Sequence, residues 1–258
     1  MIRLLALFSL SLLAQAAGVP EHAIWDSIVR AYVNSEALVS YKALKEKSRP
    51  ELDRYIAMLA MKWPDSMTQS GRKAALINAY NALMIRWVLD NYPIESVWRT
   101  KRPFTEARHT VDGRKMSLDD VETTLRNMGD PRIHAAIVCA SRGCPPLRRE
   151  AYVESRLDAQ LDDSTRSWLA NPARNQFFPH PRVAEVNPIF KWYRGDFEKN
   201  GGSVRSFLAK YAPPENAFLK QPQVRIRYTS YHWGLNDSSS LGSSYSYANF
   251  LLDAARNK

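Results

Sequence analysis

Cysteine is scarce in this chain of 258 residues, which has only Cys139 and Cys144. So few thiols exclude the framework of several disulfides that staples many small secreted domains. The two cysteines and the scattered histidines match no common zinc spacing. The Cys-x4-Cys interval also differs from the Cys-x-x-Cys spacing of thiol redox motifs. We therefore expect neither a bound metal nor a cofactor.

Long hydrophobic runs are absent as well, and none approaches the about 20 residues that a membrane-spanning helix needs. The first apolar run, Leu4–Leu13, is short, follows a single Arg3 and precedes an Ala-Gln-Ala pattern that ends at Ala16. This arrangement is typical of a cleavable signal peptide. We therefore predict a signal peptide over residues 1–16. The expected product, 17–258, is exported to the periplasm or the exterior without a stable membrane anchor.

Acidic residues are outnumbered, with 26 Asp and Glu against 36 Lys and Arg, and the formal net charge is +10. This balance favours anionic partners such as envelope phosphates or acidic polysaccharide. The basic residues are scattered, however, and form no basic helix or aromatic-interleaved patch, so we expect no nucleic-acid binding. The expected partner is a ligand of the cell envelope, for which the charge favours an anionic group.

Internal repeats and linkers are lacking too, whereas helical periodicity recurs along the chain. A long helix is expected over 70–91, and it is apolar nearly all round, which is typical of an interior helix. The segment Arg132–Ala140 is apolar on both faces and predicts a central strand. Shorter strands are expected at Val183–Val186 and Gln223–Tyr231. Helices outnumber strands, so the prediction is a helix-rich α+β single domain with a small central sheet.

The predicted central strand carries His134 and leads into a polar loop with Cys139, Ser141 and Cys144. Functional residues often lie on such loops, because a rigid element positions them. In an oxidising compartment the two thiols would pair and shape the loop. Alternatively, one of them is a reactive thiolate with a base beside it. Residues 134 and 139 are an odd number apart, so a regular strand would direct them to opposite faces.

Polar residues within apolar stretches mark further candidates. Asn78 and Asn81 are three apart on the long helix and therefore share a face. Buried amides need partners, so these two bond either to the backbone of adjoining loops or line a pocket under the predicted strand. Asp196 and His232 each lie within an aromatic run that is otherwise typical of core.

Four blocks of the sequence together resemble the bacterial and plant family called domain of unknown function 547. They span about residues 70 to 236 and are Asn78-Ala-Tyr80-Asn81-Ala, His134 with Cys139-Ala-Ser141 and Cys144-Pro145, Trp192-Tyr193 with Asp196-Phe197, and Tyr231-x-Trp233-x-Leu235-Asn236. The family name brings no established reaction. The resemblance implies a fold similar to papain-like and transglutaminase-like thiol enzymes. Those enzymes have their nucleophilic Cys at the start of a buried helix, whereas this helix has none, and His232 stands where the family often has Asp.

Two functions follow as hypotheses. The first is a thiol-dependent hydrolase or acyl transferase that acts on envelope peptides or amides. Its predicted catalytic residues are His134, Cys139, Cys144 and His232, and its predicted ligand-binding residues are Asn78, Asn81, Ser141 and Asp196. The second is a non-catalytic ligand-binding domain whose loop is shaped by a disulfide.

Overall fold

The computed structural model describes residues 18–199 and 202–256. The predicted signal peptide, residues 1–16, lies outside this part of the chain. Within the described residues, every helix is too short or too polar to cross a membrane.

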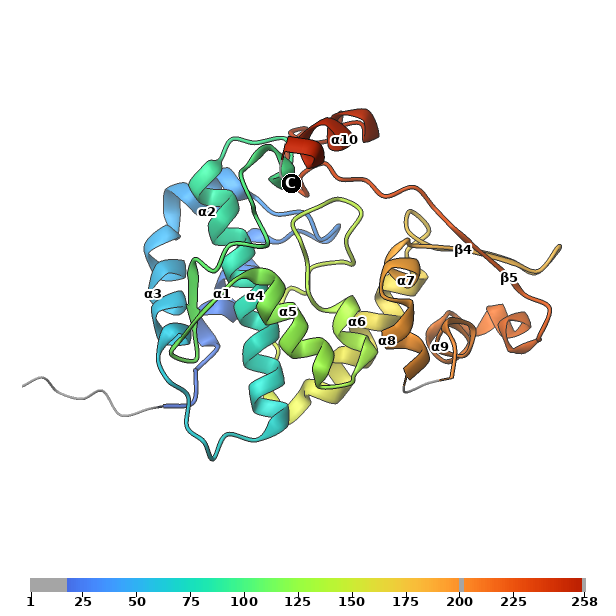
Figure 1. The fold of residues 1–258 in the computed structure, drawn as a ribbon, viewed down its shortest axis with the longest axis horizontal. Helices are drawn as coiled ribbons and strands as arrows, with labels where there is room; N and C mark the ends of the chain where they lie inside the picture. The colour runs from blue at the N-terminus through green and yellow to red at the C-terminus, as the bar shows by residue number, and fades with distance from the viewer. Residues whose placement is uncertain (1–17, 200–201, 257–258) are drawn as a thin grey trace, which may run out of the picture.

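The amino-terminal part is a layer of helices packed around one long helix (Figure 1). Helix α4 (Gln69–Asn91) contacts α2 (Tyr41–Lys47) and α3 (Arg49–Ala60), and α3 contacts α1 (Ala23–Tyr32). The predicted long helix is thus confirmed. It is buried because apolar side chains surround it on almost all sides.

A hairpin and a capped helix cover another side of α4. Strands β1 (His109–Val111) and β2 (Arg114–Met116) pair antiparallel through a two-residue turn with positive φ angles, 51° at Asp112 and 71° at Gly113. Helix α5 (Leu118–Asn127) follows and begins with a capping box between Ser117 and Asp120. Helix α5 packs on α4.

The predicted central strand over 132–140 is wrong. The segment Pro131–Ala135 forms the 3₁₀ helix η2, and irregular chain follows it. Asp130 starts this turn by accepting a hydrogen bond from the backbone of Arg132. The side-chain amide of Asn81 bonds to backbone groups of this segment that would otherwise pair with a neighbouring strand. The apolar residues on both faces are buried by helices instead.

The largest sheet in the described chain has three short strands. Strand β4 (Val183–Val186) pairs antiparallel with β3 (Gln176–Phe178) and parallel with β5 (Arg225–Tyr228). The strand predicted at 183–186 is confirmed. Figure 1 shows β4 and β5 on the opposite side of the molecule from α3, so this sheet does not form the centre of the fold.

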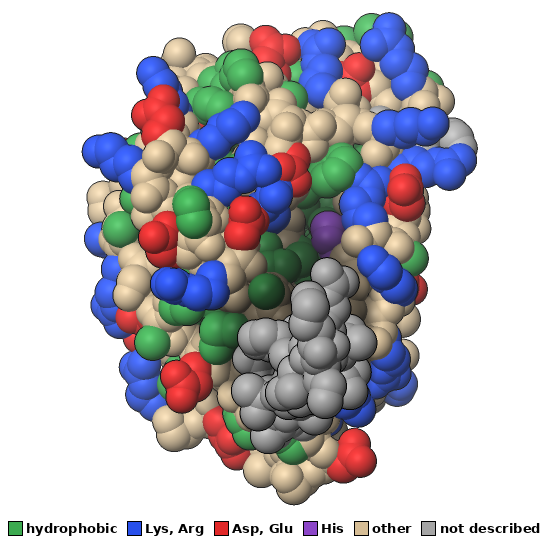
Figure 2. All heavy atoms as spheres, turned by 90° about the vertical axis from the view of Figure 1, so that its left-hand side faces the viewer, with side chains coloured by type: hydrophobic (Ala, Val, Ile, Leu, Met, Phe, Trp, Pro, Cys, Tyr) green, Lys and Arg blue, Asp and Glu red, His purple; other side chains and the backbone are tan. Residues whose placement is uncertain are grey.

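Helices and 3₁₀ turns make up most of the remaining structure. They are η1 (Val97–Arg99), η3 (Glu154–Arg156), α6 (Leu157–Ala170), α7 (Ile189–Trp192), α8 (Arg194–Lys199), α9 (Val204–Tyr211), η4 (Pro214–Lys220) and α10 (Tyr247–Arg256). The fold is therefore a helix-rich α+β structure with small sheets, as the sequence predicts. Figure 2 shows Lys and Arg interspersed with Asp and Glu on the face in view, without a field of one sign.

Candidate functional site

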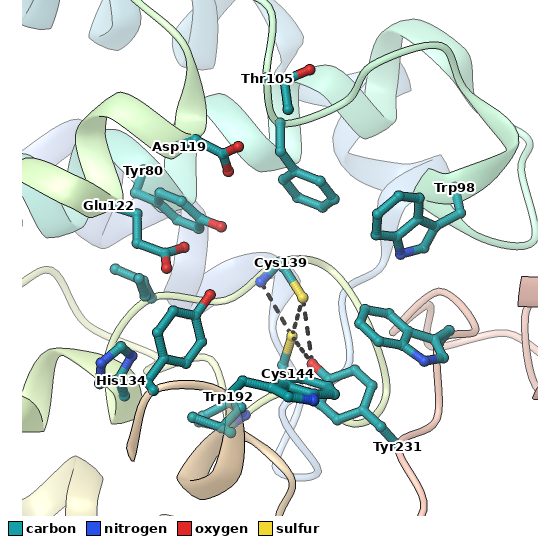
Figure 3. A pocket seen from close by; sticks show the side chains of 16 residues that line it. Tyr80, Trp98, Thr105, Asp119, Glu122, His134, Cys139, Cys144, Trp192 and Tyr231 are labelled. Carbon is teal, nitrogen blue, oxygen red and sulfur yellow. Dashed lines mark hydrogen bonds between the residues drawn. The ribbon is translucent and has the colours of Figure 1, made fainter. Parts of the chain in front are cut away.

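A cavity of about 290 Å³ is lined largely by aromatic side chains. It lies among α5, η1, α7, the cysteine loop and the segment 231–233. Its lining residues are Tyr80, Trp98, Phe104, Thr105, Asp119, Glu122, His134, Ile137, Cys139, Cys144, Pro145, Ile189, Trp192, Tyr193, Tyr231 and Trp233. Figure 3 shows Cys139 in the middle of this set. The structure thus brings His134 and both cysteines to one cavity.

The cysteine loop is held by the backbone of a segment almost a hundred residues later. The backbone N–H of Arg142 donates to the carbonyl of Gly234 at 2.8 Å, and that of Gly143 donates to His232 at 2.8 Å. A β-carbon at Gly143 would lie 2.9 Å from the nitrogen of His232 and from the Tyr231 ring. Only glycine allows this approach, which places the Tyr231 ring beside the two thiols.

Both cysteines are free thiols, so the predicted disulfide is not present in the structure. Their sulfur atoms lie 2.8 Å apart. The hydroxyl of Tyr231 donates to the sulfur of Cys144 at 3.1 Å and lies 3.4 Å from that of Cys139. The hydroxyl of Ser141 also lies 3.4 Å from the sulfur of Cys139. Cys139 is therefore surrounded by groups able to donate to a thiolate (Figure 3).

The two thiols differ in acidity. The hydrogen bond from Cys144, with smaller contributions from Ser141 and Tyr231, lowers the pKa of Cys139 to about 7. Burial and the neighbouring Cys139 raise the pKa of Cys144 well above its usual value. Cys144 is buried, whereas Cys139 is partly exposed. Cys139 is therefore the thiol that ionises more readily near neutral pH, and Cys144 keeps its proton.

His134 is buried, and its ring packs against the ring of Tyr193. Its Nε2 lies 2.8 Å from a carboxylate oxygen of Asp196, which also accepts from Arg126 at 2.6 Å. These two bonds hold the pKa of Asp196 well below its usual range, and the bond with His134 has the larger effect. The imidazole stacks on Tyr193 with 4.3 Å between ring centroids. Within the described structure His134 makes no hydrogen bond to either thiol, and Figure 3 shows it to one side of the sulfur atoms.

The other predicted residues support the backbone and do not line the cavity. Asn78 bonds to both backbone groups of Tyr152, at 2.8 and 3.0 Å. Asn81 donates to the carbonyl of Ala136 at 2.9 Å and accepts from Val138 at 2.8 Å. His232 is exposed. Its Nδ1 accepts from the backbone of Gly234 at 3.1 Å, and its Nε2 lies 3.2 Å from the carbonyl of Ser243.

Asp119 and Glu122 line the cavity, although neither is among the predicted site residues. Asp119 and Glu122 are three apart on α5 and therefore share a helix face. That spacing is visible in the sequence. It indicates a site only once the packing of α5 beside the cysteine loop is known.

Replacing Cys144 by Ala should raise the pKa of Cys139 above about 7, since it removes the strongest donor to that thiolate. A rise of one in this pKa would lower the thiolate fraction at pH 7 about fivefold. The rate of Cys139 alkylation by iodoacetamide, measured between pH 5 and 10, reports the change. Ser141→Ala, which removes a weaker contact, should shift the profile less. An unchanged midpoint in the Cys144 variant would contradict the assignment.

Comparison with known proteins finds one family. Residues 64–169 match the family described as "Protein of unknown function, DUF547". No curated protein and no solved structure matches the chain, and the similarity to papain-like and transglutaminase-like enzymes stays a prediction. The matched segment contains α4, α5, His134 and both cysteines, while the aromatic blocks at 192–197 and 231–236 lie beyond it. The predicted resemblance to this uncharacterised family is thus confirmed over residues 64–169.

Proposed function

We propose that this protein is a thiol-dependent hydrolase or acyl transferase with Cys139 as its nucleophile. The observation that carries the proposal is the environment of this thiol. Its sulfur lies at the wall of an aromatic cavity, 2.8 Å from a second thiol and 3.4 Å from a tyrosine hydroxyl. A partly exposed cysteine with its pKa lowered to about 7 is typical of a reactive rather than a structural thiol.

The proposed reaction has two steps. The Cys139 thiolate attacks the carbonyl carbon of an ester or amide, a carbon–sulfur bond forms, and the bond to the leaving group breaks. The leaving group takes one proton and departs as an alcohol or amine. Water, or an acceptor amine or alcohol, then attacks the thioester. This releases the acid or the transferred product and the Cys139 thiolate, and the proton of the water or acceptor returns to the group that protonated the leaving group.

Two neighbouring groups suit the proton transfer to the leaving group. Cys144 keeps its proton because burial raises its pKa well above the usual value, and it lies 2.8 Å from the nucleophilic sulfur. The hydroxyl of Tyr231 donates to the sulfur of Cys144 and lies 3.4 Å from that of Cys139. The guanidinium of Arg174 donates to the carbonyl of Cys144 and adds positive charge behind the pair. This charge interacts with Cys144 and Tyr231.

One observation favours a second function, a non-catalytic ligand-binding domain. His134, the expected base, bonds to Asp196 and stacks on Tyr193, and it does not contact a thiol in the described structure. A histidine held in this way stabilises the aromatic wall. In this alternative the cavity binds a ligand without turnover. Envelope peptides and amides remain the proposed substrates or ligands, consistent with the signal-peptide pattern at the amino terminus.

Trapping the thioester tests the proposal. The protein is mixed with p-nitrophenyl acetate, quenched in acid and digested with trypsin. Cleavage after Arg132, Arg142 and Arg148 places Cys139 and Cys144 on separate peptides. We expect one acetyl group on the peptide with Cys139 and release of p-nitrophenol. Absence of an adduct on Cys139, while the cavity still binds a ligand, would favour the binding domain.

A further inference from the structure

We infer that the substrate of this cavity carries a cationic group, a protonated amine or a quaternary ammonium, bound between the carboxylates of Asp119 and Glu122 and the aromatic wall. The inference rests on the proposed function for the place of the reacting carbonyl. It adds the substrate class, which the chemistry of the thiols leaves open.

The charges at the cavity carry this inference. Asp119 and Glu122 are its acidic lining residues, and the lining contains neither Lys nor Arg, although the protein as a whole has a net charge of +10. Figure 3 shows both carboxylates on the side of the cavity opposite Trp98, with Cys139 between. A substrate that reacts at Cys139 therefore extends past two negative charges.

Neither carboxylate forms a close ion pair, although the charge of Arg126, one turn later on α5, acts on Glu122, and Tyr193 lies within hydrogen-bonding reach of Glu122. Within residues 18–199 and 202–256, neither Asp119 nor Glu122 has a Lys or Arg nitrogen within 4 Å. Other acidic residues nearby are paired, such as Asp196 with Arg126 and Asp130 with Arg132. Partial desolvation raises the pKa of Asp119, and the like charges of Glu122 and Asp120 raise it further. A bound cation would relieve this repulsion, whereas an anion would add to it.

The aromatic side chains complete the recognition of a cation. Trp233 stacks on Trp192 with 5.4 Å between ring centroids, and it meets Trp98 edge-on at 5.8 Å. Tyr231 lies 4.4 Å from Trp233 on the side of the thiols. Faces of tryptophan and tyrosine rings attract ammonium groups, above all where water is excluded. Because the rings also offer apolar surface, a substituted ammonium suits this cavity better than a hydrated metal ion.

Alkylating reagents of different charge measure this preference without requiring turnover. Iodoacetate, iodoacetamide and 2-bromoethylamine each form one carbon–sulfur bond with the thiolate of Cys139 and release a halide ion. Each rate is divided by the rate of the same reagent with N-acetylcysteine amide at equal thiolate concentration. We expect this relative rate to be at least about tenfold higher for the cationic reagent than for the anionic one, with the neutral reagent between them.

Charge-neutral variants locate the effect. Glu122→Gln and Asp119→Asn should each reduce the ratio of the 2-bromoethylamine rate to the iodoacetamide rate several-fold. Glu36→Gln makes the same change of charge on an exposed loop that does not line the cavity, and it should preserve the preference. Equal relative rates for the three reagents, or loss of the preference in Glu36→Gln as well, would overturn the inference.

A reversible ligand gives a second measurement. Choline and its neutral isostere 3,3-dimethylbutan-1-ol have nearly the same shape. Choline should protect Cys139 from iodoacetamide at concentrations at least about tenfold lower than the alcohol, and Glu122→Gln should remove the difference. Equal protection by both compounds would show apolar binding only and contradict a cation site.

The two proposals fail separately. A charge preference at Cys139 without a trapped acyl group would contradict the acyl-transfer proposal and support the cation site. A trapped acyl group without a charge preference would support acyl transfer and contradict the cation site.

Discussion

Replacing Cys139 by Ser is expected to abolish acyl transfer. A serine hydroxyl lacks the acidity that the surroundings of Cys139 give its thiol, for which the pKa is lowered to about 7. At neutral pH the variant has no anionic nucleophile, and His134 bonds to Asp196 instead of to residue 139 in the described structure. We expect the rate of p-nitrophenyl acetate hydrolysis to fall about 10³-fold or more. Release of p-nitrophenol at saturating ester measures it.

Cys144→Ser is the matched control, because it removes one sulfur from the same loop. This variant should retain hydrolysis with its pH profile displaced, since a serine hydroxyl can still donate to the Cys139 thiolate. Thermal unfolding of both variants shows whether the loop keeps its structure. Full activity in Cys139→Ser, or equal losses in both variants, would contradict Cys139 as the nucleophile.

Local signals in the sequence predict much of the fold. The apolar pattern over 70–91 gives α4 within one residue at its start. The Asp112-Gly113 turn, a common hairpin turn, connects β1 and β2, and Ser117 caps the start of α5. Each of these features depends on residues within one or two turns of chain. The signals for these features are local in the sequence, so periodicity and capping rules apply.

The segment 132–140 shows where such reasoning fails. Apolar residues on both faces indicate burial, and they do so equally for a central strand and for irregular chain among helices. The deciding partner is Asn81, more than fifty residues earlier, which bonds to Ala136 and Val138. Since the chain is not a strand, alternation does not apply, and His134 and Cys139 line the same cavity despite their odd spacing.

The candidate site could likewise be predicted only in part, because some of its residues come together through contacts between distant parts of the sequence. Its two thiols and His134 stand out as residue types in one short segment of sequence. The bond between His134 and Asp196 joins residues 62 apart, and that between Tyr231 and Cys144 joins residues 87 apart. The carboxylates of α5 carry no mark in the sequence beyond their spacing. Only the packing of α5 against the loop shows that they face the thiols.

Replacing Asn81 by Ala is expected to cause the largest loss of stability among polar substitutions at the site. The side chain is 2 % exposed, and its amide satisfies the carbonyl of Ala136 at 2.9 Å and the N–H of Val138 at 2.8 Å. Alanine would leave both backbone groups buried without partners, at about 1–3 kcal/mol each. We expect the free energy of unfolding, measured in urea, to fall by about 2–5 kcal/mol.

Asn91→Ala on the same helix provides the control. Asn91 is partly exposed and donates only to Trp87, one turn earlier in α4, so its loss should cost less than about 1 kcal/mol. Asn81 also fixes the chain between His134 and Cys139. The variant should therefore broaden or shift the pH profile of Cys139 alkylation, whereas Asn91→Ala should not. If Asn81→Ala lost no more stability than the control and kept the same profile, the chain that carries Cys139 would be held by its apolar packing, and the amide would be dispensable.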